Sequence, residues 1–340
     1  MTMNKNDKKI MLAHGGGGQL SDDLIRNTIL ARISPKAEKL GDSAVIETNG
    51  GSLCFTTDSY VVKPLFFSGG DIGKLAVCGT VNDLAVAGAI PMALSLALII
   101  ESGFEISTLE RILDSIALEA QKLNVRIVTG DTKTVEEGEA DGIFINTSGI
   151  GFRPASVHPG FDRISPGDKI ILSGTIGDHG MTIISQRKGI KFSSPLASDC
   201  AGLSPLISKI QEHCPEVKFM RDPTRGGLAA SLNEISRETG LSVTIEQDHI
   251  PVSPTVQAAA DALGFDVLNI ANEGKFIAVA APDSVDKLMD ICTSHELGKK
   301  AAVIGEIISE SGRPAVEMVT SIGGKRIVQM PYGRELPRIC

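Results

Sequence analysis

GKLAVCGTVNDLAVAGAIP, which begins at Gly73, is followed directly by the apolar run MALSLALII, which ends at Ile100. The first stretch is rich in Ala, Leu and Val and predicts a helix over Asp71–Gly88, while Met92–Ile100 predicts a strand. Outward from this pair, apolar residues recur every three or four positions in Ser107–Leu123, the period of an amphipathic helix. Further strands are predicted at Ser52–Thr57, Val125–Thr129 and Gly142–Ile150.

A second region of the same kind follows a break in the pattern. Gly151–Asp168 contains three prolines and several glycines, which favours a linker. Beyond it we predict strands at Lys169–Ser173, Ser242–Glu246, Gly274–Ala281 and Ala301–Ile307, and helices at His179–Lys188, Gly202–His213, Arg225–Thr239, Pro254–Leu263 and Ser284–His295. Strands and helices therefore alternate in two α+β domains, residues 1–155 and 156–322. Residues 323–340 are predicted to form a flexible tail, because Pro331, Gly333 and Pro337 prevent a continuing helix.

Composition limits the kind of protein. A length of 340 residues suits two domains, and a net charge of −8 provides no basic stripe for nucleic acid. No run of about 18 apolar residues is present, and the polar N-terminus lacks the core of a signal peptide. Six scattered cysteines form no C-x-x-C pair, so we expect reduced thiols and a cytoplasmic protein.

Five aspartates share one setting, at the end of an apolar run or inside one, beside Gly, Thr or Ser. Each alone is more often a turn or capping residue. Gathered around a site, carboxylates hold Mg²⁺ while nucleotide phosphates complete its coordination. Asp83 fits the capping role least, since it lies mid-helix, and Asp131 follows a predicted strand and would point into a cleft. The five are Asp42, Asp58, Asp83, Asp131 and Asp222.

Other motifs offer anion sites and a base. Gly15–Gly18 precede a helical pattern, so their N–H groups could approach an anion, although four glycines also suit a flexible loop. Residues 68–75 approximate a Walker loop but carry Ser68 and Leu75 at the defining positions, which excludes one. Ser173–Gly180 is a second anion-loop candidate, in which His179 is more readily a capping or packing residue than a catalyst. Glu273, in a loop before a strand, is a candidate general base.

Taken together, these residues resemble the HypE family of hydrogenase maturation factors. The resemblance covers nearly the whole chain and includes AHGGGGQ from Ala13, TTDSYVVKPLFF from Thr56, GKLAVCGTVNDLAVAGAIP from Gly73 and IVTGDTK ending at Lys133. It continues with SGTIGDHG from Ser173, RDPTRGGL from Arg221, NEGK from Asn272 and the terminal Pro337-Arg338-Ile339-Cys340. The terminal PRIC is the most specific element, because it is absent from relatives of the same fold such as aminoimidazole ribonucleotide (AIR) synthetase, selenophosphate synthetase and thiamine-monophosphate kinase.

This resemblance implies a fold and a reaction. The fold is the two-domain PurM or AIR-synthetase-like type, in a homodimer that binds ATP near the subunit interface. A carbamoyltransferase, HypF, places a carboxamide on the terminal cysteine, and the chain dehydrates it to a thiocyanate with ATP and Mg²⁺. The cyanide then passes to iron on a HypC–HypD complex, on its way to the [NiFe] hydrogenase centre.

The resemblance assigns the aspartates to the nucleotide and its metal, and the reaction that it implies needs a base, for which Glu273 is the candidate, and a cation near the developing negative oxygen, for which Lys133 is the candidate. The expected catalytic residues are Cys340, Glu273 and Lys133. The expected cofactor-binding residues are Gly15, Gly16, Gly17, Gly18, Asp42, Asp58, Asn82, Asp83, Gly130 and Asp131. The expected metal-binding residues are Asp42, Asp58, Asp83, Asp131 and Asp222.

Two alternatives remain open at this stage. One keeps the fold and makes the chain a small-molecule synthetase or kinase of the selenophosphate synthetase kind; that enzyme would carry a reactive residue in the glycine loop, where this chain has His14. The other is a non-enzymatic carrier whose tail only shuttles a carbamoyl group, against which the aspartates argue.

Overall fold

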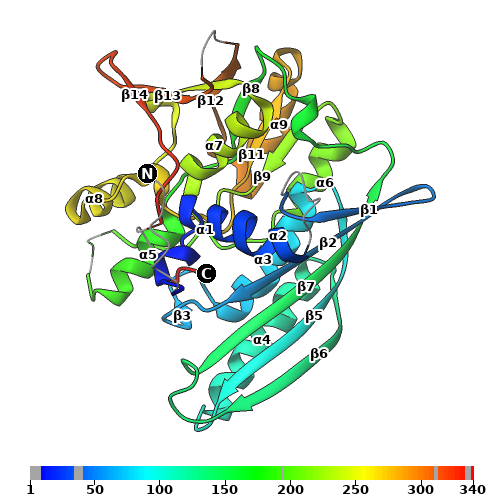
Figure 1. Cartoon of the computed structure of the whole chain (residues 1–340), viewed down its shortest axis with the longest axis vertical. Coiled ribbons are helices and arrows are strands. Elements are labelled where there is room, and N and C mark those ends of the chain that lie inside the picture. The colour runs from blue at the N-terminus through cyan, green and yellow to red at the C-terminus, as the bar shows by residue number, and fades with distance from the viewer. Residues whose placement is uncertain (1–8, 34–40, 191, 193, 310–312, 334–337) are drawn as a thin grey trace.

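Helix α3 (Ile72–Val86) lies at the centre of the molecule and belongs to both halves of the chain (Figure 1). Asp71 caps its first turn by accepting hydrogen bonds from the amides of Gly73 and Lys74. Thirteen of its fifteen residues are buried, as expected for a helix that is apolar on every side. The structure is a computed structural model that describes residues 9–33, 41–190, 192, 194–309, 313–333 and 338–340.

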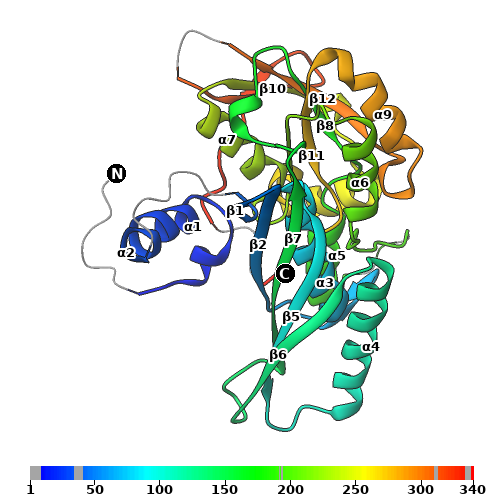
Figure 2. The ribbon, with the colours of Figure 1, turned by 90° about the vertical axis from the view of Figure 1, so that its right-hand side faces the viewer.

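The first half is a five-stranded sheet with helices on one face. Its strand order is β1-β2-β7-β5-β6, antiparallel except for β5 and β6, which are parallel and joined through α4 (Ile106–Lys122). Figure 2 shows α3 and α4 on one side of this sheet. The strands are β1 (Ala44–Thr48), β2 (Gly51–Tyr60), β5 (Ile90–Glu101), β6 (Arg126–Val135) and β7 (Ile143–Pro154), and a small ribbon pairs β3 (Phe66–Phe67) with β4 (Gly70–Asp71).

The second half is a seven-stranded sheet covered on both faces. Alternate residues of one strand point to opposite sides: Ile170 and Leu172 pack with α7, whereas Ile171 packs with α6 and α9. The strand order is β14 (Lys325–Ile327), β13 (Val316–Val319), β10 (Ser242–Glu246), β12 (Ala302–Ile308), β8 (Lys169–Leu172), β11 (Ile277–Ala280) and β9 (Phe219–Arg221). The helices are α5 (Asp178–Arg187), α6 (Ser204–His213), α7 (Gly227–Thr239), α8 (Pro254–Leu263) and α9 (Val285–Thr293).

Short helical turns complete the chain. The N-terminal segment folds as the 3-10 turn η1 (Leu12–Gly15), α1 (Gln19–Leu24), the π-helical η2 (Ile25–Leu30) and α2 (Ala31–Ile33). Single 3-10 turns lie at η3 (Phe161–Arg163), η4 (Gln247–His249), η5 (Val267–Asn269), η6 (Pro282–Ser284) and η7 (Glu296–Gly298).

The two halves are joined by a buried amide as well as by apolar packing. The Asn82 side chain donates to the carbonyls of Ala201 and Glu273 and accepts from the amide of Leu203. Ala85 and Val86 at the end of α3 pack with α6 and α9 of the second half. These contacts fix the position of α3 relative to the loops of the second half.

The predicted α+β class and alternation are confirmed, and each predicted helix and strand of the two regions has a counterpart. The sequence did not reveal β1, β9, β13 or β14, which have three to five residues and too little periodicity to detect. Two boundaries differ: β7 continues to Pro154 inside the predicted linker, and β14 lies inside the predicted tail, where it pairs with β13.

Candidate active site

A cavity of about 640 Å³ lies where the two halves meet the N-terminal segment and the end of the chain. This volume is typical of a small-molecule site. Strand β2, helix α3, the residues between β9 and α7, and the N-terminal loop all contribute to its wall. Eight residues predicted for the site line it: Gly15, Gly17, Asp42, Asp58, Asp83, Asp222, Glu273 and Cys340.

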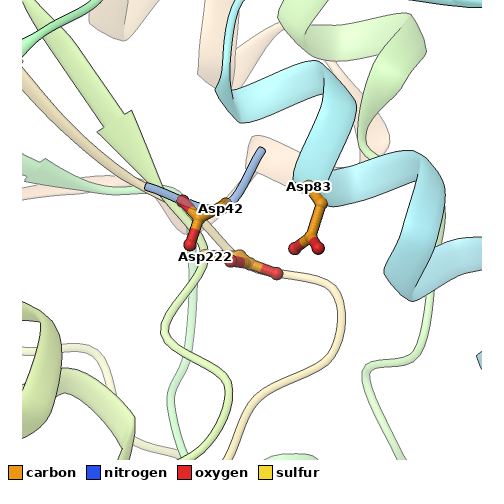
Figure 3. A group of neighbouring side chains, drawn as sticks. All are labelled: Asp42, Asp83 and Asp222. Atoms are coloured by element: carbon orange, nitrogen blue, oxygen red, sulfur yellow. The ribbon is translucent and has the colours of Figure 1, made fainter. Parts of the chain in front are cut away.

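Three of the predicted aspartates converge inside this cavity. Asp42 precedes β1, Asp83 lies on α3 and Asp222 follows β9, and each offers a carboxylate oxygen within 4.8 Å of the others (Figure 3). Burial and the neighbouring carboxylates raise the pKa of Asp83 and of Asp222 well above the usual range, and burial raises the pKa of Asp42. A divalent cation bound by these oxygens would relieve this repulsion, so the three residues fit a hard metal ion such as Mg²⁺.

Two arginines oppose the carboxylates. Arg221 contacts Asp42 at 3.2 Å and Glu234 at 2.7 Å, and Arg225 lies 3.7 Å from Asp58. Surrounding carboxylates raise the pKa of Arg221 despite its burial, and the thiolate form of Cys340, together with Asp58, would raise the pKa of Arg225. Both arginines belong to the motif RDPTRGGL, which begins at Arg221, but the local sequence does not predict which carboxylates they contact.

Asp58 and Asp83 each have a further partner on β2. The Tyr60 hydroxyl donates to Asp58 at 3.4 Å, and the Thr56 hydroxyl donates to Asp83 at 2.7 Å. Asp58 is thus held by a tyrosine and an arginine at the edge of the group of three, where it can support a ligand or its metal.

Glu273 lies in the loop before β11, as predicted, but the sequence did not reveal that its side chain is buried. It is 4 % exposed, and its Oε1 has no hydrogen-bond partner among the described residues. Asp199 accepts from the amides of Glu273 and Gly274 and pairs with Lys275 at 3.1 Å, which fixes this turn. Burial, assisted by Cys200 and Asp222, raises the pKa of Glu273 well above its usual range. A carboxyl group with a raised pKa and an unpaired oxygen suits proton transfer.

The terminal thiol lies in the same cavity. Burial raises the pKa of Cys340 to about 12, while Arg225 opposes this effect. The guanidinium of the nearby Arg338 contacts Asp141. The docked thiol is therefore protonated and a poor nucleophile.

The glycine loop is explained largely by packing. A Cβ on Gly17 would lie 2.3 Å from that of Arg225, and one on Gly18 would lie 2.0 Å from the Pro331 carbonyl oxygen. Gly16 lies against Gly333, whereas nothing lies within 4 Å of a Cβ on Gly15. The loop thus packs against Pro331 and Gly333 near the end of the chain, and of its four glycines only Gly15 and Gly17 line the cavity.

Six predicted site residues do not line this cavity: Gly16 and Gly18 of the loop just described, and Asn82, Gly130, Asp131 and Lys133 elsewhere in the described chain. Asn82 faces the second half through the hydrogen bonds given above. Strand β6 continues to Val135, so Asp131 lies within the strand and not at its end. In the sheet register, Asp131 of β6 pairs with Ala97 of β5, which continues across the sheet to Asn146 of β7 and Ser59 of β2. Three strand spacings, about 14 Å, therefore separate Asp131 from β2. Lys133 pairs with Asp131 at 2.9 Å on the same exposed edge, and Gly130 packs on Leu96.

We expect Gly18→Ala to lower the free energy of unfolding by about 1–3 kcal/mol, because the added methyl group overlaps a backbone carbonyl. Gly15→Ala is the matched control and should change stability by less than about 0.5 kcal/mol. Chemical denaturation of both variants measures the difference. Equal stability would mean that the chain near Pro331 does not rest on this loop.

The crowded aspartates predict a definite pH dependence. Their folded-state pKa values are raised, so above the ordinary aspartate pKa of about 3.9 the unfolded chain binds fewer protons than the folded chain, and stability falls as pH rises. We expect metal-free protein to be less stable at pH 8 than at pH 6, and Asp83→Asn to reduce that difference by about 1 kcal/mol.

Mg²⁺ should restore stability at pH 8 in the parent and much less in Asp83→Asn. Calorimetry with and without MgCl₂ measures both effects. Identical pH slopes in parent and variant would remove Asp83 from the coupled group.

Comparisons with known proteins agree with this geometry. Residues 40–152 match the N-terminal domain of AIR synthase related proteins, and residues 165–316 match the C-terminal domain. Carbamoyl dehydratase HypE of Rhizobium leguminosarum bv. viciae is 45% identical over 334 residues, 98% of this chain and 95% of that protein. The Escherichia coli K12 protein of the same name is 42% identical over 337 residues, 97% of this chain and 99% of that one.

Solved structures agree as well. A crystal structure of a HypE–HypF complex contains a chain with a TM-score of 0.86 and 43% identity, over 91% of this chain and 99% of that one. A hydrogenase maturation protein HypE in complex with ATP gives a TM-score of 0.83 and 40% identity, over 98% and 100%. Thiamine monophosphate kinase of Aquifex aeolicus, at 16% identity and a TM-score of 0.65, shares the fold. Among the described residues, no helix is long and apolar enough to cross a membrane.

Proposed function

The chain belongs to the HypE family of carbamoyl dehydratases, and from this premise we propose how its own residues perform ATP-dependent dehydration of an S-carboxamide on Cys340 in hydrogenase maturation. One observation carries the assignment. The thiol of Cys340, the unpaired oxygen of Glu273 and the three clustered aspartates line one cavity. A carrier that only shuttled a group would have no need of this arrangement.

The proposed chemistry converts –S–C(=O)–NH₂ into –S–C≡N. The amide oxygen attacks the γ-phosphorus of ATP and ADP leaves, which turns a poor leaving group into a phosphate ester. The nitrogen then loses two protons in all, the C–O bond breaks, and inorganic phosphate departs with the former amide oxygen. The chain loses one oxygen and two hydrogens, the equivalent of one water.

Asp42, Asp83 and Asp222 are the proposed ligands of a magnesium ion, with Asp58 beside them. When bound, the ion would offset the charge of the triphosphate. Arg221 and Arg225 border the same cavity and supply fixed positive charge toward the nucleotide or the developing phosphate.

Glu273 is the proposed base for the amide protons. Its raised pKa brings its proton affinity closer to neutral pH, where a general base is effective. We expect Glu273→Gln to bind ATP and to accept the carbamoyl group, yet to dehydrate it about 10²–10⁴-fold more slowly.

Single-turnover mass spectrometry on purified carbamoylated protein measures this rate through the loss of one water. A rate within about threefold of the parent would identify another base. The pair Asp199 and Lys275, which holds the turn, provides a control: Lys275→Ala should lower stability as well as rate, whereas Glu273→Gln should lower only the rate.

We further propose a homodimer through the outer face of the five-stranded sheet. This face carries the side chains of Ile46, Phe55, Ile99 and Ile150, each at least 41% exposed, opposite the face that packs on α3 and α4. Apolar residues exposed in such a row favour an interface. The edge strand β6 would then approach the second subunit and carry Asp131 and Lys133 with it, which offers Lys133 a role in the partner's cavity.

Mixing two inactive variants tests this role of Lys133. In a heterodimer of Lys133→Ala and Glu273→Gln, one of the two cavities would combine an intact Glu273 with an intact Lys133 from the other subunit. Random reassembly should therefore restore about a quarter of the parent dehydration rate, by two-fold symmetry. No restoration, with heterodimers verified by native mass spectrometry, would mean that Lys133 acts within its own subunit or not at all.

The proposed partners follow from the reaction. A solved relative forms a HypE–HypF complex, and we propose that HypF delivers the carbamoyl group to this chain. We propose a HypC–HypD complex as the acceptor of the cyanide. The six cysteines are unpaired, which is consistent with a reducing cytoplasm.

A further inference from the structure

The main-chain carbonyls of the last three residues are all bound by the body of the protein. Arg187 donates to the carbonyl of Arg338, His179 Nε2 lies 2.9 Å from that of Ile339, and the amide of Val61 donates at 3.0 Å to that of Cys340. The donors come from the two ends of α5 and from the end of β2. A chain end that merely lay on the surface would not have every carbonyl paired in this way.

The side chains of the same three residues are also recognised. The Arg338 guanidinium contacts the carboxylate of Asp141 and donates to the Val61 carbonyl at 3.1 Å. Ile339 is 3% exposed and packs in the apolar cluster around α3. Cys340 extends past both into the cavity. The contacts therefore involve a cation, an aliphatic side chain and a terminal thiol in that order.

His179 is dedicated to this contact. Because a carbonyl only accepts, Nε2 must carry the proton, which leaves Nδ1 to accept from the Ser198 hydroxyl at 2.8 Å. The Ser198 oxygen in turn accepts from the amide of Cys200 at 3.0 Å. The imidazole is fully buried and neutral, since burial lowers the pKa of His179. Both ring nitrogens are thus engaged by hydrogen bonds, which suits a positioning residue.

We propose that Asp141, His179, Arg187 and the backbone of Val61 form a binding site for a C-terminal Arg-Ile-Cys tripeptide, which selects the sequence and sets the sulfur in the cavity. The proposal rests on the proposed function for its purpose, but its contacts need neither ATP nor the carboxamide. Capture of a chain terminus through its main-chain and side-chain groups is an established mode of peptide recognition. It follows that the site binds the tripeptide even when it is not joined to the same chain.

The first test uses the accessibility of Cys340 in the full-length protein. The other five cysteines are at most 2% exposed, so alkylation with iodoacetamide, read by mass spectrometry of the C-terminal peptide, reports release of the tail. Asp141→Ala should speed alkylation about tenfold, the expected effect of losing a hydrogen-bonded charge pair. Lys63→Ala is the matched control, because the Lys63 side chain contacts the other carboxylate oxygen of Asp141 and makes no ion pair with the described residues of the tail. The alkylation rate of this variant should stay within about twofold of the parent rate.

His179 is tested in the same assay by a conservative pair. His179→Gln keeps a donor for the Ile339 carbonyl and should alkylate close to the parent rate, whereas His179→Leu removes the donor and should alkylate faster. Equal rates for Asp141→Ala and Lys63→Ala, or for the two His179 variants, would overturn the proposed contacts.

The second test separates recognition from covalent attachment. Ile339→Asp introduces a carboxylate that the apolar cluster excludes, so the site should be vacated in an otherwise complete chain. A fluorescent peptide ending in Leu-Pro-Arg-Ile-Ser should then bind this variant, measured by anisotropy, and a peptide with Asp in place of Arg should bind at least tenfold more weakly.

Folding of Ile339→Asp is checked by circular dichroism and by retained ATP binding. Failure of the folded variant to bind the Arg-Ile-Ser peptide would overturn the proposal, while dehydration by the parent would still stand. Conversely, if Ile339→Asp binds the peptide but the parent protein shows no dehydration activity, the recognition site would stand and the proposed function would be wrong.

Discussion

Mutual repulsion among Asp42, Asp83 and Asp222 is the constraint on which the rest of the site depends. Three carboxylates within 4.8 Å of one another in a partly buried cavity are unfavourable by themselves, as their raised pKa values indicate. The chain tolerates the arrangement because arginines stand close by and because the rigid surroundings prevent the carboxylates from separating. On the proposed function, a bound cation and the phosphates that accompany it would relieve this repulsion.

Holding the charges together requires the two halves of the chain to be fixed relative to each other. Asp42 and Asp83 belong to the first half and Asp222 to the second, so a small domain movement would disperse them. Two buried amides contribute to this arrangement: Asn82 links α3 to the second half, and Asn272, within the second half, accepts from the Gly177 amide and donates to the Pro223 carbonyl next to Asp222. These residues carry no catalytic chemistry, yet the geometry of the site depends on them.

The sequence predicts the elements and much of the acidic cluster because those signals are local. Asp83 was identifiable as a charge in an all-apolar helix, and helix and strand periods are visible over ten or more residues. The partners of Arg221 and Arg225 were not identifiable, since they depend on contacts between distant segments. The position of Asp131 was misjudged because β6 is longer than its apolar run, which moved the residue from the strand's end to an exposed edge. The packing of the glycine loop against the chain near Pro331 was not predictable either, because more than 300 residues separate the two segments.

The state of Cys340 connects the tail to the chemistry. Burial that raises a thiol pKa to about 12 penalises the thiolate and does not penalise a neutral carboxamide. On the proposed function, the cavity thus disfavours the nucleophilic form that would accept a carbamoyl group and admits the product of that acceptance. The last three residues would therefore accept the carbamoyl group outside the cavity and undergo dehydration inside it. If the contacts to Arg338 and Ile339 are kept when the sulfur is modified, discrimination between the two tails rests on the charge on sulfur and on the groups that bear on its pKa, Arg225 and Glu273.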